Sequence, residues 1–256
     1  IVLAGWLFSI PIIIHEQALI PGLANRICSV FADKIAVSFT KSAFKGEKVV
    51  LTGNPIRHEI LKIPKGVKLT HPKGGLLPTV LVVGGNQGSH VINLAVEQCL
   101  DKLVKIASII HVTGDNKFKD YERLEELKRA GKLGERYTVE RWIGEEYGAI
   151  LAKSDLVVSR AGINTLTEVT LLDKPVLLIP IPSSEQNANA KYFEQLGLAR
   201  ILPQSKLSGI TLLNNIRLML KGLSRSEDKV KKTKEMFVSD AAKRLTLEVM
   251  LLARNP

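Results

Sequence analysis

The chain has 256 residues, 45% of them hydrophobic, which is enough to bury the core of one large domain or two modest ones. Its two cysteines, Cys28 and Cys99, lie far apart in apolar helix-like runs, so they indicate core positions in a reducing compartment and not a disulfide or metal site. The net charge of +11 favours an anionic partner, such as a nucleotide diphosphate, a lipid head group or a nucleic acid.

Pro11 divides the apolar start of the chain into a helix-like piece and a strand-like piece. This start is too short to cross a bilayer and lacks the basic region and cleavage site of a signal peptide. A strand over 11–14 would deliver His15, Glu16 and Gln17 to its carboxyl end, with a helix after it. His15 has either a structural or a functional role. An acid and a carboxamide share its turn, which favours the functional role.

Strands at 35–37 and 49–51 lead to the loop TGNPIR at 52–57. Gly53 and Pro55 fix this loop, so Arg57 could reach an anion with little loss of entropy; the alternative is a solvated surface arginine. Residues 62–78 contain four Lys, three Pro and three Gly and indicate an exposed linker, where we expect a domain boundary.

A buried strand at 79–83 runs into the glycine turn 84–89, and a helix follows over 90–103. This Gly-Gly-x-x-Gly turn favours a phosphate or a sugar, but it is not G-x-G-x-x-G and no acidic residue lies at the expected distance. A nicotinamide cofactor is therefore disfavoured. Strands at 108–112 and 137–140 flank a charged helix over 117–130, which we interpret as a solvated face.

The loop after that last strand contains Trp142 and Ile143. These residues either cover a planar base or pack in the core.

The stretch 155–190 predicts a strand–helix–strand unit followed by a further helix. Its strands, at 156–158 and 176–179, are apolar without alternation, which is typical of strands buried on both faces of a parallel sheet. Both helices start at carboxyl ends of strands, where open α/β sheets bind ligands.

Polar residues lie at those helix starts. Gly162 lets a ligand approach, Thr165 can donate a hydroxyl, and the first-turn amides attract a phosphate. Glu168 would repel a phosphate but can accept two hydrogen bonds from a ribose diol. Gln186 and Asn189 face the same crevice. The alternative is an ordinary turn and helix cap.

Toward the end of the chain we expect a strand at 199–202 and helices at 208–221, 225–237 and 241–254. Lysines at the third of these helices either meet a membrane surface or are solvated: Lys229, Lys231, Lys232 and Lys234. The sequence has no H-E-x-x-H, no cysteine ligand set and no G-x-S-x-G.

Five segments occur in order and at fitting spacings: HEQ-x-x-x-PGLANR at 15–26, TGNPIR at 52–57, LVVGGNQGSHVIN at 81–93, SDLVVSRAGINTLTE at 154–168 and IPIPSSEQNANA at 179–190. Together they resemble the MurG family of peptidoglycan N-acetylglucosaminyltransferases over essentially the whole chain. The resemblance implies an α/β protein of GT-B type with two Rossmann-like parallel-sheet domains, the N-terminal one incomplete. It implies a remnant acceptor and membrane-facing domain at 1–70, a UDP-sugar domain at 71–238, and a helix at 239–256 packing back on the first domain.

The implied reaction moves N-acetylglucosamine from UDP-N-acetylglucosamine, with inversion, to the C4 hydroxyl of the muramyl sugar of lipid I, giving lipid II. Helix amides and an arginine stabilise the leaving group, with no metal and no cofactor. The resemblance also implies a peripheral protein on the cytoplasmic face of the bacterial plasma membrane, at an anionic surface, without nucleic acid.

The resemblance implies a set of donor contacts: Arg57, Gly85, Asn86, Gln87, Gly88, Ile143, Gly162, Ile163, Asn164, Thr165, Leu166, Thr167, Glu168, Gln186 and Asn189. Acceptor-side or structural roles fall to His15, Glu16, Gln17 and Asn25. The family's candidate general base belongs to a GGTGGH loop that would lie upstream of Ile1, so the base is unassigned here and His15 is only a substitute candidate.

The sequence departs from the family at three further positions. Ala18 stands for the usual Asn, Asn86 for a common Ser, and Glu185 for the usual His. With the missing loop, we expect a fragment that is catalytically incomplete alone. Two alternatives stay open: a GT-B enzyme acting on another lipid such as diacylglycerol, and a non-catalytic UDP-sugar-binding scaffold.

Overall fold

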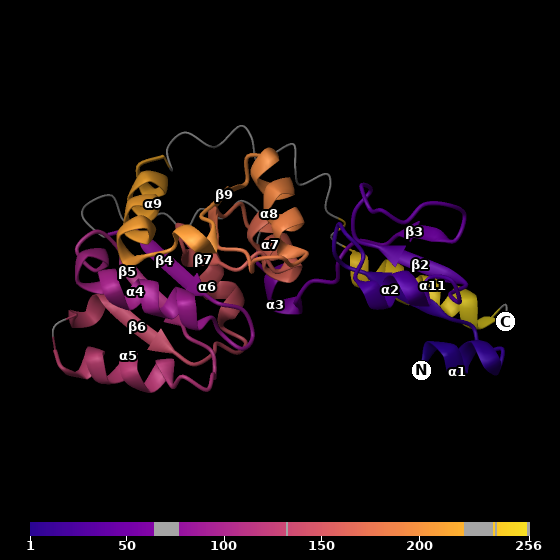
Figure 1. Cartoon of the computed structure of the whole chain (residues 1–256), viewed down its shortest axis with the longest axis horizontal. Helices are drawn as coiled ribbons and strands as arrows, with labels where there is room; N and C mark the ends of the chain where they lie inside the picture. Colours follow the sequence, from indigo (N-terminus) through magenta and orange to yellow (C-terminus); the bar gives the residue numbers. More distant parts are fainter. Residues whose placement is uncertain (64–76, 132, 223–237, 239, 255–256) are drawn as a thin grey trace. The chain divides into compact units, whose positions relative to one another are not determined.

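The structure is a computed structural model that describes residues 1–63, 77–131, 133–222, 238 and 240–254. Contacts divide the chain into two compact units (Figure 1). The first comprises residues 1–57 and the C-terminal helix α11 (Ala241–Arg254), and the second begins at His58. Each unit contains its own parallel sheet, so the predicted α/β class is confirmed.

The first unit has a three-stranded sheet in the order β1 (Ile13–Glu16), β2 (Lys34–Val37), β3 (Val49–Leu51). Two short helices, α1 (Val2–Leu7) and α2 (Leu23–Cys28), accompany it. Helix α11 belongs to this unit, because Lys34 forms an ion pair with Glu248 at 2.5 Å. At Gly53 a Cβ would lie 2.6 Å from the Cβ of Val238, so the TGNPIR loop packs closely against the chain entering α11.

The second unit has a six-stranded parallel sheet in the order β6-β5-β4-β7-β8-β9. Its strands are β4 (Thr79–Val83), β5 (Ser108–Val112), β6 (Tyr137–Glu140), β7 (Leu156–Ser159), β8 (Val176–Leu178) and β9 (Ala199–Ile201). Strand order runs outward in both directions from β4 and β7, whose ends Val83 and Ser159 are register partners. The gap between these two strands is therefore the topological switch point, where such sheets bind ligands.

Helices cover both faces of this sheet. Because crossovers are right-handed, the opposite directions of travel from the switch point place the two sets of helices on opposite faces. One face carries α4 (His90–Leu103), α5 (Asp120–Arg129) and α9 (Gly209–Gly222), and Val80 and Val82 of β4 join their apolar core. The other face carries α6 (Tyr147–Lys153), α7 (Ile163–Leu171) and α8 (Gln186–Gln195).

Some boundaries differ from the sequence expectation. His15 and Glu16 are the last residues of β1 and do not follow the strand. Helix α5 starts at Asp120 and not at 117, because Lys119 has a left-handed φ of 52°. The sequence analysis missed α6, and the expected helix at 225–237 with its four lysines lies outside the described residues.

The contact boundary falls between Arg57 and His58, earlier than the expected boundary at residue 70. The short helix α3 (His58–Leu61) packs on α6: a Cβ at Gly148 would lie 3.1 Å from the carbonyl oxygen of Glu59. Residues 58–61 therefore belong with the second unit.

Candidate functional site at the switch point

Close backbone packing builds the turn after β4. At Gly84 a Cβ would lie 2.3 Å from the backbone nitrogen of Ser89. At Gly88, where φ is +73°, it would lie 1.7 Å from the carbonyl oxygen of Thr113. No side chain with a Cβ fits at either position, so the turn is pressed against the loop that follows β5.

The tip of the same turn is open. Gly85 has a φ of +93° and no atom within 4 Å of a built Cβ. Asn86 and Gln87 are exposed, and neither side chain hydrogen-bonds to the described residues. The hydroxyl of Ser89 is buried without a partner in the same part of the chain. Two donors and one unsatisfied hydroxyl thus lie where a phosphate or sugar was predicted.

The turn after β7 leads into α7 through Gly162, which has ordinary extended backbone angles (φ −69°, ψ 134°) and open space around a built Cβ. No side chain caps this helix end. The intrahelical hydrogen bonds start with the N–H of Leu166, which donates to Gly162 O at 3.1 Å. The N–H groups before it point out of the helix end, a geometry that attracts anions.

Three of the predicted donor contacts on α7 are buried side chains. Leu166 is fully buried, and the Thr167 hydroxyl donates to Ile163 O at 2.8 Å. Glu168 is 2% exposed, so its carboxylate lies beneath the helix surface. Ile163, Asn164 and Thr165 are less buried and line the helix end. The role of Glu168 toward a ribose diol stays a prediction.

Helix α8 reaches the same turn. The Gln186 Oε1 accepts a hydrogen bond from Ile181 N at 3.2 Å, which holds the start of the helix. Asn189 is 1% exposed, and its Nδ2 donates to Ala161 O at 3.3 Å. Asn189 therefore ties α8 to the turn after β7, and its Oδ1 has no partner among the described residues.

Arg160 is a residue of this turn that the sequence analysis did not assign to the site. Its Nη1 donates to Ile179 O and to Gln204 Oε1, both at 2.8 Å. Burial lowers the pKa of its guanidinium. The available signal was an arginine directly after a buried strand, but its acceptors lie 19 and 44 residues away in the chain.

The loop after β6 places Trp142 in solvent. Its side chain is 77% exposed, so the alternative that it packs in the core is wrong. Ile143 is half-buried beside it. The neighbouring Arg141 lies over the Tyr121 ring, 4.9 Å from the centroid, and pairs with Glu122 at 2.6 Å. An exposed aromatic ring at the edge of a sheet is available to cover a planar base.

In the first unit, His15 is part of the local structure of the TGNPIR loop. Its Nε2 lies 3.2 Å from both Gly53 O and Ser38 Oγ. Burial lowers the pKa of its imidazole, while the contact with Gly53 and the charge of Glu16 oppose that shift.

Glu16 organises the segment that follows it. Its carboxylate accepts hydrogen bonds from Ala18 N (2.8 Å), Gly22 N (3.1 Å) and Asn25 Nδ2 (3.0 Å). Glu16 and Asn25 therefore fix the entry to α2, whereas Gln17 is exposed. Arg57 is exposed at the end of this unit, and its role as a donor contact stays a prediction.

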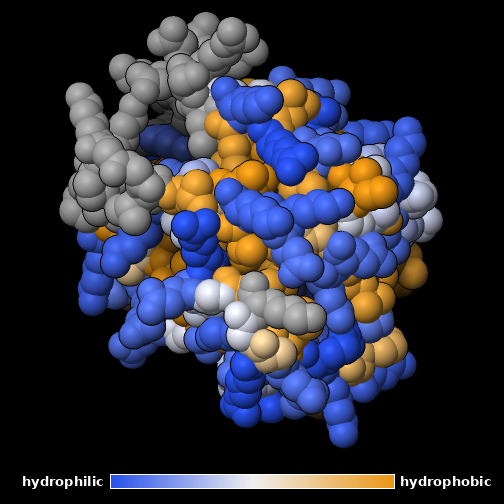
Figure 2. Space-filling view, turned by 90° about the vertical axis from the view of Figure 1, so that its left-hand side faces the viewer, coloured by the Kyte–Doolittle hydropathy of each residue, from blue (hydrophilic) through white to orange (hydrophobic). Residues whose placement is uncertain are grey.

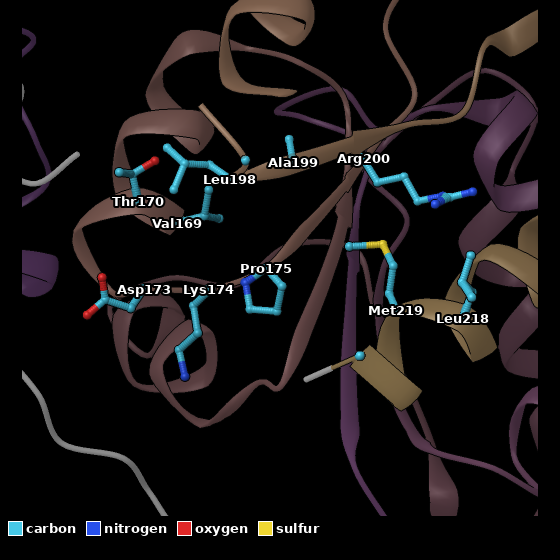
Figure 3. A pocket seen from close by; sticks show the side chains of 12 residues that line it. Val169, Thr170, Asp173, Lys174, Pro175, Leu198, Ala199, Arg200, Leu218 and Met219 are labelled. Carbon is cyan, nitrogen blue, oxygen red and sulfur yellow. The ribbon is translucent and has the colours of Figure 1, made fainter. Parts of the chain in front are cut away.

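A separate pocket of about 280 Å³ opens at the amino ends of the strands, opposite to the carboxyl ends that form the switch point (Figure 3). It lies where β8 and β9 begin, since Pro175 and Leu198 directly precede those strands. Leu218 and Met219 of α9 form another wall, with Lys174 and Arg200 at its margins. It contains none of the predicted site residues.

Figure 2 shows a face on which hydrophilic side chains predominate, with apolar areas among them. Helix α5 buries only Asp120 and Leu124, as expected for a solvated charged helix. None of the described helices combines the length and apolar character needed to span a bilayer, and no cluster of three or more metal-ligating side chains occurs in the described ranges.

Two family profiles match the chain. The glycosyltransferase family 28 C-terminal domain matches residues 79–245, and the N-terminal domain of that family matches residues 1–37. Among solved structures, Acinetobacter baumannii MurG has a TM-score of 0.71 and 26% identity, covering 96% of this chain and 68% of that one. The calicheamicin glycosyltransferase CalG4 (TM-score 0.67, 15% identity, 99% and 70% covered) shares the fold, so the predicted GT-B type is confirmed.

Curated relatives are more similar in sequence. The enzyme named UDP-N-acetylglucosamine–N-acetylmuramyl-(pentapeptide) pyrophosphoryl-undecaprenol N-acetylglucosamine transferase of Clostridium botulinum (strain Loch Maree / Type A3) is 37% identical over 224 residues. The match covers 84% of this chain but 60% of that protein. The enzyme of the same name from Clostridium kluyveri is 36% identical, with 96% and 68% covered.

Proposed function

The chain belongs to glycosyltransferase family 28, and we propose that it is the donor-binding part of a UDP-N-acetylglucosamine-dependent hexosyltransferase of peptidoglycan synthesis. The observation that carries this proposal is the identity of 37% to a relative named as the N-acetylglucosamine transferase acting on pyrophosphoryl-undecaprenol. The open helix end at the switch point supports it from geometry, because that end suits the diphosphate of a nucleotide sugar.

The proposed reaction inverts the anomeric carbon of the donor. The C4 hydroxyl of the muramyl sugar of lipid I attacks this carbon, the bond to UDP breaks, and lipid II forms with a β-1,4 bond. Negative charge develops on the departing diphosphate, so donors already aimed at it lower the barrier. The N–H groups at the start of α7 would supply such donors, with Arg57 as the proposed cation.

The other donor roles fall to residues that follow strand ends of the six-stranded sheet. We assign the diphosphate and sugar to the tip Gly85, Asn86 and Gln87, and the sugar also to Gln186. The loop with Trp142 and Ile143 would hold the uracil. The general base stays unassigned.

We further propose peripheral association with an anionic membrane surface at the cytoplasmic face. The net charge of +11 supports attraction to such a surface. In and beside α1, the side chains of Trp6, Leu7 and Phe8 are 54–78% exposed, which suits shallow contact with lipid.

Calorimetric titration of the purified chain with UDP-N-acetylglucosamine tests the donor site, with UDP-glucose as the matched control. Tighter binding of the N-acetyl sugar is the expected result. Absence of binding by any uridine nucleotide contradicts the proposal. A transfer assay with a lipid I analogue and with diacylglycerol then identifies the acceptor.

A further inference from the structure

Arg160 lies in the turn that leads into α7, and no residue role was predicted for it from the sequence. We propose that Arg160 is a positioning residue of the nucleotide site that fixes this turn and whose uncompensated charge makes the site select a diphosphate over the bare nucleoside. This inference rests on the proposed function, because it concerns the same helix end.

Hydrogen bonds of Arg160 and Ala161 form a clamp on the turn after β7. Arg160 directly follows Ser159, the last residue of β7, and its Nη1 reaches Ile179 O beyond the end of β8 and Gln204 Oε1 beyond β9. Asn189 of α8 donates to Ala161 O, in the next residue of the turn. Two consecutive residues of the turn are thus held by three elements that follow them in the chain. Gly162 and the amides of α7 come next, so the clamp sets their direction.

The charge of Arg160 also bears on which ligand the site takes. Both acceptors of Arg160 are uncharged groups, a backbone carbonyl and a carboxamide, and no ion pair of Arg160 occurs within the described residues. Burial lowers the pKa of the guanidinium, which shows that its desolvation is not offset by a carboxylate. A partly buried cation without a counter-ion is unusual in a protein interior, and an anionic ligand would supply the missing charge.

Arg160 also has hydrogen-bonding capacity that the described residues do not use. A guanidinium has five N–H groups and stays protonated at all accessible pH values. Only Nη1 is used here, so Nε and Nη2 have no acceptor among the described residues. Because the group is half-buried, salt screens its field less than that of a surface cation. Its charge adds to that of the α7 end, and the two together favour a ligand with two phosphates.

The test measures UDP and uridine affinity side by side by calorimetry or by amide chemical shifts. Arg160→Gln removes the charge, and we expect it to weaken UDP about tenfold or more while uridine changes less than about twofold. Arg160→Lys keeps the charge and is expected to recover most of the UDP affinity. Added salt should narrow the gap between the wild-type chain and Arg160→Gln.

Gln204→Leu is the matched control, since it removes one arm of the clamp and leaves the charge. It should change UDP and uridine affinity by the same small factor. If Arg160→Gln does not fold, Arg160→Lys alone decides: a UDP-to-uridine ratio near that of the wild type supports the charge role, and a ratio that falls with a preserved fold overturns it.

Failure of this inference is distinguishable from failure of the proposed function. A wild-type chain that binds neither ligand contradicts the nucleotide site itself. A wild-type chain that binds UDP, together with an Arg160→Gln variant that binds UDP equally well or loses UDP and uridine in parallel, contradicts the role of Arg160 alone.

Discussion

The two halves of the six-stranded sheet meet at the switch point and use their glycine turns in opposite ways. After β4, Gly84 and Gly88 let backbone pack on backbone at distances that exclude any Cβ. After β7, Gly162 has ordinary backbone angles and empty space around it. The same sequence signal, a glycine turn after a buried strand, therefore marks close packing at the base of the turn after β4, whose tip at Gly85 is open, and room around Gly162 itself in the turn after β7.

Beneath the open tip of the β4 turn, the polar groups of the first half are satisfied within the protein. In the β4–β5–β6 half, Asn93 donates to Thr113 O and to Asp120, and its Oδ1 lies 3.0 Å from His111 Nε2. The other nitrogen of His111 lies 3.0 Å from the Tyr137 hydroxyl. This network is closed within the protein. In the β7–β8–β9 half, the helix end and Arg160 keep unused donors.

The largest effect should come from Gly88→Ala. The added Cβ would meet Thr113 O at 1.7 Å and force a positive φ of +73° on alanine. We expect the free energy of unfolding to fall by about 3 kcal/mol or more, because backbone atoms must move. Urea unfolding measures it. Gly131→Ala is the control: φ is +80° but nothing lies within 4 Å, so only strain of about 1 kcal/mol is expected. Equal losses would refute the packing argument.

The closed network predicts a dependence of stability on pH. Burial lowers the pKa of the His111 imidazole to about 3 from its usual value of about 6.5, against the opposing charge of Asp120. Between these two pKa values the imidazole is protonated in the unfolded chain and neutral in the folded one. The contribution of His111 to the free energy of unfolding is therefore complete above about pH 6.5 and is lost as the pH falls below that value. The loss should be on the order of 1 kcal/mol per pH unit below about pH 6.

Hydrogen exchange of the β5 and β6 amides at several pH values measures this loss in the second unit. His111→Gln should flatten the dependence while lowering stability overall. His58→Gln, which alters an exposed histidine, should leave it unchanged. A slope that persists in His111→Gln would assign the effect to other groups.

Much of the fold is predictable because burial on both faces leaves a strong pattern. The apolar runs at 79–83 and 156–158 correspond to β4 and β7, and the C-terminal helix spans 241–254 as expected. Helix α6 was not predictable: it has seven residues, too few for a clear period, and its Gly148 is explained only by contact with α3. The local sequence is enough to predict the strands, but it does not show which helix packs against a given glycine.

The candidate site was predictable where it depends on strand ends, and not where it depends on distant partners. Gly85, Gly162 and Gln186 lie at strand ends or helix starts in both sequence and structure. Arg160 was missed because its two hydrogen-bond acceptors, Ile179 O and Gln204 Oε1, are distant from it in the sequence. The exposure of Trp142 also required the structure, because an aromatic residue after a strand fits core and surface equally well.

Gly162→Ser would test the open half directly. A serine at a helix N-cap stabilises the helix by accepting from the second or third amide, so the free energy of unfolding should stay equal or rise by a few tenths of a kcal/mol. The same hydroxyl accepts from an N–H group that the diphosphate would otherwise use, so UDP affinity should fall about fivefold to tenfold. Gly162→Ala adds the Cβ without the hydroxyl and separates steric from hydrogen-bonding loss. Unchanged UDP affinity in the serine variant would place the ligand elsewhere.

The smallest expected effect is that of Thr165→Val, a substitution of nearly equal shape that removes one hydroxyl from the helix end. Thr165 is partly buried, and its hydroxyl has no hydrogen bond to the described residues, so stability should change little. One neutral donor to a phosphate corresponds to about 1 kcal/mol, hence a loss of UDP affinity of about threefold to fivefold with uridine unaffected. Thr170→Val is the contrasting change, because its hydroxyl donates to Leu166 O at 2.8 Å inside the same helix. That variant should lose stability and keep the UDP-to-uridine ratio, so parallel behaviour of the two threonines would remove the distinction between an open helix end and a closed helix body.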